Sequence, residues 1–276
     1  MSLKKNSFKI IAKKIRLKIF ETIIQAGKGH IGGAFSCVDI LVALYFGKIL
    51  KFNIKKLKDI NRDTFIFSKG HASIALYVTL AEAKFFDQKE LKKFNMGGGK
   101  IAEHPDRRLP GVEVVSGSLG HGLSISAGMS LANKINNNKS FNYVLLGDGE
   151  CYEGSIWEAA MFANHYNLNN LVAIVDRNNL TVLNKTENII KLEPFADKWR
   201  SFGWNVIIVD GHNIDRLCGK LKKIKNNNKN KKPTVLIANT IKGKGASFME
   251  NQIKWHHGVP SKENLMQFKK ELDYGK

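Results

Sequence analysis

The chain has 276 residues, 43% of them hydrophobic, which is enough to bury a full core as one domain or at most two small ones. No run of about 18 apolar residues occurs, and the basic N-terminus lacks an apolar core and a cleavage site. We therefore expect neither a membrane span nor a secretory signal. Cys37, Cys151 and Cys218 are odd in number and far apart, which favours a reduced cytoplasmic protein over a disulfide or zinc framework.

The formal net charge of +20 invites a nucleic-acid interpretation, but its distribution does not favour one. The lysines are spread along the chain among many asparagines and isoleucines, which indicates a bias of composition. The densest run, residues 220–232, contains no aromatic side chain that could stack on a base. We expect a solvated helix end and loop there, and a non-catalytic nucleic-acid-binding protein stays open as a remote alternative.

Helix-length and strand-length segments alternate along the chain. The expected helices are residues 8–19, 38–50, 72–86, 123–132, 196–202, 214–225 and 262–272, with a further one beginning at 87 and a crossover helix after Gly149. The expected strands are residues 64–67, 143–146, 171–175, 205–209 and 233–238. Residues 27–33 and 95–111 are predicted loops, rich in glycine. This alternation, without repeat or linker, predicts a single α/β domain over residues 1–276, with a parallel sheet flanked by helices.

Polar residues follow the second and third expected strands. Asp148 stands between Gly147 and Gly149, and Asn178 follows the next strand. Ligands of parallel sheets bind beyond the carboxyl ends of the strands, so these side chains should share a site. A carboxylate, an amide oxygen and the Leu180 carbonyl suit Mg²⁺, and the glycines would let a diphosphate approach closely. The alternative is a plain turn in which Asp148 caps the next helix.

Residues 147–149, followed by Glu153-Gly154 and Glu158-Ala159 and closed by Asn178, resemble the thiamine diphosphate motif of transketolases. Further motifs of that family agree in the same order, at residues 29–30, 36, 39–40, 68–71, 104–105, 117–120, 240–245 and 257–260. The resemblance spans about residues 10–260. It implies a thiamine-diphosphate-binding fold and, for the whole chain, a single diphosphate-binding domain.

The resemblance also implies roles for the matching residues. The metal, Mg²⁺ or Ca²⁺ or Mn²⁺ in its place, would be bound by Asp148, Asn178 and the Leu180 carbonyl. The thiamine diphosphate would be contacted by His71, Gly117, Leu119, Asp148, Gly149, Glu153, Asn178 and His257, with Gly117 and Leu119 meeting the aminopyrimidine through their backbone. Glu153 and Glu158 would also help to form a subunit interface and a proton-linked network between active sites.

Three histidines would surround the reacting carbon, namely His30, His104 and His257. Histidine suits hydrogen bonding to sugar hydroxyls and proton transfer because its unperturbed pKa, about 6.5, is close to working pH. The implied reaction is the transfer of a two-carbon ketol unit from a ketose (phosphate) to an aldose (phosphate), usually in the pentose phosphate pathway. Another thiamine diphosphate enzyme of the same fold is the alternative: a deoxyxylulose-phosphate-synthase-like enzyme or a transketolase-like enzyme of specialised metabolism.

Full-length transketolases carry a second domain with a glutamate that activates the cofactor. The sequence ends at Lys276, and Ser118 and His121 depart from the Pro and Gln that are common in the full-length family. Both features resemble the N-terminal subunit of a split transketolase. We therefore expect a C-terminal partner subunit that carries the activating glutamate, an α2β2 assembly and sugar phosphate substrates.

Overall fold

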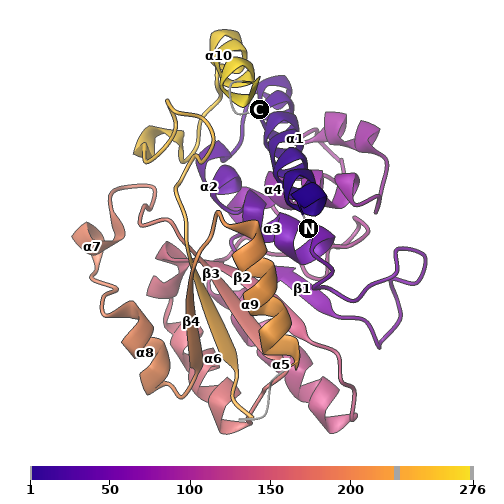
Figure 1. Ribbon diagram of the computed structural model, residues 1–276, viewed down its shortest axis with the longest axis vertical. Helices are drawn as coiled ribbons and strands as arrows, with labels where there is room; N and C mark the ends of the chain where they lie inside the picture. The colour runs from indigo at the N-terminus through magenta and orange to yellow at the C-terminus, as the bar shows by residue number, and fades with distance from the viewer. Residues whose placement is uncertain (1, 227–230, 274–276) are drawn as a thin grey trace.

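A five-stranded parallel sheet forms the centre of the computed structural model, which describes residues 2–226 and 231–273 (Figure 1). The strands lie in the order β1 (Thr64–Phe67), β2 (Asn142–Gly147), β3 (Leu171–Arg177), β5 (Thr234–Asn239), β4 (Asn205–Asp210). All five expected strands and the parallel sheet are thereby confirmed. Strand β3 extends two residues beyond the expected end, because Asp176 and Arg177 remain paired with β5.

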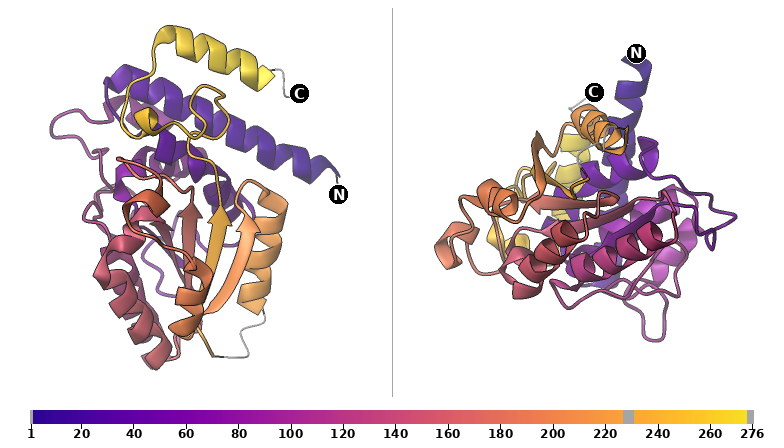
Figure 2. Two further views of the ribbon diagram at one scale, coloured as in Figure 1. Left: turned by 90° about the vertical axis from the view of Figure 1, so that its left-hand side faces the viewer. Right: turned by 90° about the horizontal axis from the view of Figure 1, so that it is seen from below.

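Helices cover both faces of the sheet (Figure 2). The core on one face contains side chains of α3 (Val38–Phe46), α4 (Ser73–Glu82) and α9 (Ile214–Asn226). The helix α1 (Ser2–Ala26) extends this core by packing against α3 and α4. The other face packs against α5 (His121–Ile135), α6 (Gly154–His165) and α8 (Phe195–Ser201). Successive strand residues enter opposite cores, as Leu145 and Leu146 do. A strand that is buried on both faces is apolar throughout, which explains the continuous apolar runs in the sequence.

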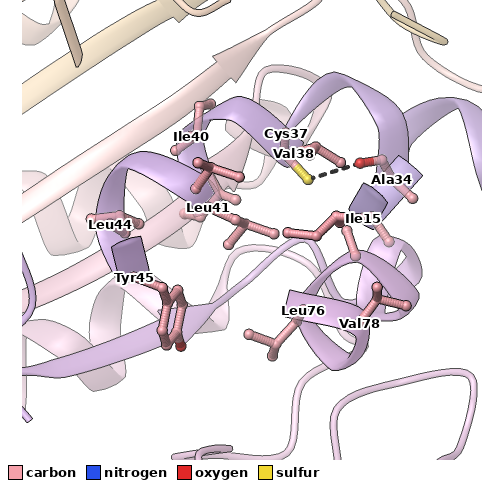
Figure 3. Close-up of a cluster of buried hydrophobic side chains, with 14 of the residues drawn as sticks. Ile15, Ala34, Cys37, Val38, Ile40, Leu41, Leu44, Tyr45, Leu76 and Val78 are labelled. Atoms are coloured by element: carbon pink, nitrogen blue, oxygen red, sulfur yellow. Dashed lines mark hydrogen bonds between the residues drawn. The ribbon is translucent and has the colours of Figure 1, made fainter. Parts of the chain in front are cut away.

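The larger core joins α1, α3 and α4 through closely packed aliphatic side chains (Figure 3). Ile15 of α1 and Leu41 of α3 lie beside Leu76 and Val78 of α4, and all four are almost completely buried. Cys37 donates to the Ala34 carbonyl at 3.4 Å. Cys37 and the other two cysteines, Cys151 and Cys218, are free and buried.

Several element boundaries differ from those expected. The helix α2 (Ile31–Ser36) begins inside the predicted 27–33 loop, because Ile31, Ala34 and Phe35 pack into the core. Residues 87–93 form a short 3₁₀ helix, η2 (Gln88–Lys93), capped by the Asp87 side chain, instead of an α-helix. Residues 95–111 contain no helix or strand, as predicted. The remaining elements are η1 (Gly70–Ala72), η3 (Gly149–Tyr152), α7 (Thr186–Ile189), η4 (Ile253–Trp255) and α10 (Lys262–Asp273).

The last helix, α10, packs beside the first, α1 (Figure 2, left). The rings of Phe20 and Phe268 stack with centroids 5.0 Å apart. In the basic run 220–232, α9 ends at Asn226, and residues 227–230 lie outside the described residues. None of the helices within 2–226 and 231–273 is long and apolar enough to cross a membrane.

Candidate active site

Asp148 and Asn178 lie next to each other at the carboxyl edge of the sheet, because Gly147 of β2 pairs with Asp176 of β3. The Asp148 carboxylate accepts hydrogen bonds from Asn179 N at 2.6 Å and Gly149 N at 2.8 Å. Its nearest cation is Arg177, whose Nη1 is 3.4 Å away. Burial raises the pKa of Asp148, the Asp176 charge raises it further, and Arg177 only partly offsets the increase. A bound cation would relieve this buried charge.

A cavity of about 410 Å³ opens in front of these residues. Most of the predicted cofactor and metal residues line it, namely His71, Gly117, Leu119, Asp148, Gly149, Asn178 and Leu180. Two lysines, Lys69 and Lys242, also line it, and they supply positive charge facing Asp148. A cavity of this size, lined by apolar loops with a few charged groups, fits a small-molecule cofactor with an anionic end.

Glycine backbone forms part of the cavity wall. A Cβ atom added to Gly149 would lie 3.2 Å from Cγ2 of Thr181, and one added to Gly117 would lie 3.2 Å from Cδ2 of His104. Both distances are tighter than an ordinary van der Waals contact, so side chains here would crowd the wall. The two glycines therefore leave backbone groups open to a ligand.

Four histidines gather at one end of the cavity. The ring centroid of His30 lies 4.6 Å from that of His257 and 5.5 Å from those of His71 and His256. Burial, followed by the charge of His257, lowers the pKa of His30 to about 4. Burial and the charge of Lys242 lower the pKa of His256 to about 3. Both imidazoles are therefore neutral at pH 7. His256 adjoins the predicted His257 but was not assigned a role from the sequence.

The two remaining predicted residues differ in position. The exposed His104 follows Glu103 and borders Gly117, which lines the cavity. Glu153, in contrast, is not among the described residues that line the cavity. It precedes α6, is exposed and makes no side-chain cap. His257, which was also predicted to contact the cofactor, is likewise not among the described residues that line the cavity.

Sequence reasoning missed an ion pair beneath the cavity. Lys69, after β1, donates to Asp176 of β3, and both side chains are almost completely buried. Asp176 also accepts hydrogen bonds from Ser36 Oγ at 2.6 Å and from the Thr240 hydroxyl. The Asp176 carboxylate thus connects the carboxyl ends of β1, β3 and β5 with α2. The residues 68–71 and 176–179 were visible as motifs at strand ends, but no local pattern connects Lys69 with Asp176.

Two further charged residues at the site were also missed. Glu150, a buried residue that lines the cavity, accepts hydrogen bonds from Gly120 N and Gly147 N, both at 2.9 Å, and from the Ser68 hydroxyl. Burial raises its pKa. Lys242 donates to the carbonyls of Leu180 at 3.2 Å and Thr181 at 2.9 Å. Burial and the charge of Lys69 lower the pKa of Lys242 to about 8.

Comparisons with known proteins agree with this geometry. The family model for the thiamine diphosphate binding domain of transketolase matches residues 7–275. One subunit of the apulose-4-phosphate transketolase of Phocaeicola vulgatus is 43% identical over 95% of this chain and 92% of that protein. The 6-deoxy-6-sulfo-D-fructose transketolase subunit SqwG of a Clostridium species is 40% identical over 89% of each chain. Human transketolase is 35% identical over 95% of this chain and 41% of its own length.

The solved structures give the same result. Transketolase from Campylobacter jejuni superposes with a TM-score of 0.89 at 29% identity, covering 96% of this chain and 42% of that one. The chain therefore spans about two fifths of the solved transketolases that it resembles. Fold and site define an α/β domain of the thiamine-diphosphate-binding class. This chain belongs to the transketolase family, through its thiamine diphosphate binding domain, which confirms the family and fold class predicted from the sequence.

Proposed function

We propose that this chain is the N-terminal subunit of a two-chain transketolase, which transfers a two-carbon ketol unit from a ketose or its phosphate to an aldose or its phosphate. The observation that carries the proposal is the cavity that Asp148 and Asn178 line together with His71 and His256 of the histidine cluster. An anionic cofactor with its metal suits one end, and a polyhydroxylated substrate suits the other.

The metal and the cofactor would be held by different groups. Asp148, Asn178 and the Leu180 carbonyl would bind Mg²⁺, or Ca²⁺ or Mn²⁺ in its place. These oxygen donors are the kind that magnesium prefers, and Asp148 supplies the only full negative charge among them. The Leu180 carbonyl already accepts from Lys242, so a metal would use its second lone pair.

The diphosphate would lie along His71, Gly149 and His257, where Lys69 and Lys242 add positive charge. The aminopyrimidine would meet Gly117 and Leu119. When bound, thiamine diphosphate supplies the carbon that takes up the ketol unit.

The histidines would act on the sugar. The ring nitrogens of His30, His104 and His257 can form hydrogen bonds with sugar hydroxyls. Because the pKa of His30 is lowered to about 4, its ring is unprotonated at pH 7 and can accept a hydrogen bond from a sugar hydroxyl. The Glu103 carboxylate lies close to this ring, with Oε1 at 3.2 Å from His30 Nδ1.

The partner would be a C-terminal transketolase subunit that carries the activating glutamate. The two relatives named as subunits of an apulose-4-phosphate transketolase support this part of the proposal, because this chain matches 92% and 91% of their length. We extend the proposal to an α2β2 assembly. The exposed Glu153 and Glu158 would lie at the interface, where α6 also exposes Met161 and Phe162.

Two of the relatives bear on the identity of the sugar substrate. The relatives that act on apulose-4-phosphate and on 6-deoxy-6-sulfo-D-fructose favour a specialised transketolase over the enzyme of the pentose phosphate pathway. A deoxyxylulose-phosphate-synthase-like reaction is the further alternative within the same fold.

The test is reconstitution with the product of a neighbouring reading frame that encodes the domain with the activating glutamate. The chain alone should be inactive, and the mixture should transfer ketol units in the presence of thiamine diphosphate and Mg²⁺. A panel of ketose donors and aldose acceptors, including sulfonated and branched sugars, then identifies the substrate. Turnover by the isolated chain would refute the two-chain proposal, and a mixture that forms a stable complex but transfers no ketol unit would refute the reaction.

A further inference from the structure

Three potential metal ligands converge beside the histidine cluster. They are His30 before α2, Glu103 in the loop before α5, and His257 after η4. The Glu103 Oε1 atom lies 3.2 Å from His30 Nδ1 and 3.6 Å from His257 Nε2. The three ligand atoms all lie within 4.8 Å of one another.

The two separations that involve Glu103 Oε1, 3.2 and 3.6 Å, are close to those between neighbouring ligand atoms of a tetrahedral metal ion. Zinc bonds of about 2.0–2.1 Å place neighbouring ligand atoms about 3.3 Å apart. His30 Nδ1 is buried and makes no hydrogen bond within the described part of the chain, although Glu103 Oε1 is close to it. A buried ring nitrogen that makes no hydrogen bond and lies close to a carboxylate oxygen is available to a cation bound between the two groups.

The backbone holds the three residues in position. Gly258 N donates to the Gly29 carbonyl at 3.1 Å, which fixes the segments of His257 and His30 to each other. The Ser73 hydroxyl on α4 donates to the carbonyl of Glu103 at 2.5 Å. Ligands that are fixed before binding lose little entropy when the metal arrives.

An ion could reach this position from solvent. The side chains of His30, Glu103 and His257 are 17%, 27% and 52% exposed. Two imidazoles and one carboxylate would leave the fourth position of a tetrahedral ion for water.

We propose that His30, Glu103 and His257 form a binding site for a divalent transition-metal ion of the zinc class, separate from the oxygen site at Asp148. Imidazole nitrogen favours Zn²⁺, Co²⁺ and Ni²⁺ over Mg²⁺, which prefers oxygen ligands. Metal binding itself does not depend on the function proposed above. Inhibition of ketol transfer by the metal does rest on that function, because a metal bound to His30 and His257 would occupy the groups assigned to the sugar hydroxyls.

The binding test uses the full chain, freed of any affinity tag and treated with chelator. Zn²⁺ is titrated calorimetrically in excess Mg²⁺, and Co²⁺ is followed by the visible absorption of its four-coordinate form. One Zn²⁺ per chain should bind with a dissociation constant of about 1 μM or tighter. Glu103→Gln and His30→Gln should each weaken binding at least about tenfold and abolish the four-coordinate Co²⁺ spectrum.

Two control variants separate this site from the rest of the surface. His165→Gln removes an exposed histidine of α6, and Asp148→Asn removes the carboxylate of the oxygen site. Both should leave Zn²⁺ affinity unchanged. Circular dichroism and the melting temperature verify the fold of each variant, and Glu103→Gln is the decisive variant because its side chain is partly exposed.

Three results would overturn the proposal. One is the absence of Zn²⁺ binding tighter than about 100 μM, and another is binding that Glu103→Gln and His30→Gln leave unchanged. The third is binding that only Asp148→Asn removes, which would assign the zinc to the oxygen site. In the reconstituted complex, Zn²⁺ should raise the KM for the sugar without displacing thiamine diphosphate. If the complex transfers no ketol unit, this last measurement and the proposed function fail together, while the binding result remains valid.

Discussion

Lys69 and Asp176 form an ion pair whose side chains are 1% and 0% exposed. Burial alone would raise the pKa of Asp176, but Lys69 and the hydroxyls of Ser36 and Thr240 hold it below its usual value. The pair lies directly beneath the cofactor cavity, which Lys69 also lines. The same contact therefore joins the strand ends and fixes one of the positive charges that face the cavity.

Replacing Lys69 by methionine should destabilise the chain by about 3–5 kcal/mol, because it leaves Asp176 buried without its cation. Urea unfolding measures the change in the free energy of unfolding. Lys93→Met is the matched control, since Lys93 and Glu90 form an exposed pair with side chains 56% and 41% exposed. Its loss should cost less than about 1 kcal/mol. Equal costs for the two variants would mean that the buried pair contributes no more than a surface one.

Replacing Asp148 by asparagine should separate cofactor binding from stability. It removes the charged group of the proposed metal site, so the dissociation constant for thiamine diphosphate with Mg²⁺ in the assembled complex should rise at least about 100-fold, or about 2.7 kcal/mol. The free energy of unfolding of the chain alone should change by less than about 1 kcal/mol, because relief of a buried charge offsets a lost hydrogen bond.

Isothermal titration calorimetry measures the affinity, and Asp197→Asn, at an exposed ion pair with Arg200, is the control. Unchanged cofactor affinity in Asp148→Asn would disprove the metal assignment.

Replacing Glu150 by glutamine should cost about 2–3 kcal/mol of stability, even though the two side chains have nearly the same shape. The carboxylate accepts from three donors, and the amide nitrogen of glutamine would face one of them. Because Gly120 ends the turn of Gly117 and Leu119, cofactor affinity should also fall. Chemical denaturation measures the stability, and the exposed Glu263→Gln is the control. An unchanged free energy of unfolding in Glu150→Gln would show that the Glu150 carboxyl is already protonated, because a protonated carboxyl, like an amide, has only one purely accepting oxygen.

The histidine cluster predicts a pH dependence of stability. The folded chain lowers the pKa of His30 from 6.5 to about 4 and that of His256 to about 3, whereas the unfolded chain does not. Between pH 6.5 and 4 the unfolded chain therefore binds protons that the folded chain excludes. The contribution of these histidines is complete above pH 6.5 and is lost as the pH falls, by up to about 1.4 kcal/mol per unit for each proton.

Denaturation at a series of pH values measures this slope, and histidine ring resonances in NMR report the individual pKa values. His256→Gln should make the slope shallower, and His165→Gln, on the exposed side of α6, should leave it unchanged. A titration of His30 near pH 6.5 in the folded chain would contradict the prediction.

The sequence predicts the strands well because each is buried on both faces, and double burial requires an unbroken apolar run such as residues 171–175. It also places Asp148 beside Asn178, because the ends of adjacent parallel strands must meet. Lys69, Asp176, Glu150 and Lys242 could not be found in this way.

In the sequence those four charged residues look like ordinary polar residues at the ends of strands. The partners that make their burial tolerable come from distant segments, as with Lys69 and Asp176. The helix α2 was missed for a related reason. Gly32 and Gly33 lower the helix propensity of this segment, and the helix forms because Ile31 and Phe35 are buried in the core.

The bond between Gly258 N and the Gly29 carbonyl has a consequence for biosynthesis. It joins the beginning of the chain to its end, as the packing of α10 on α1 also does. A ribosome synthesises β5, the last strand of the sheet, before the segment that carries His257. Until then α1 exposes the surface that Phe268 covers, and His30 has no neighbour from the late segment. The histidine end of the cavity and the packing of α10 on α1 are therefore expected to form after the sheet, and a transcript cut short after β5 would yield a sheet with an incomplete pocket.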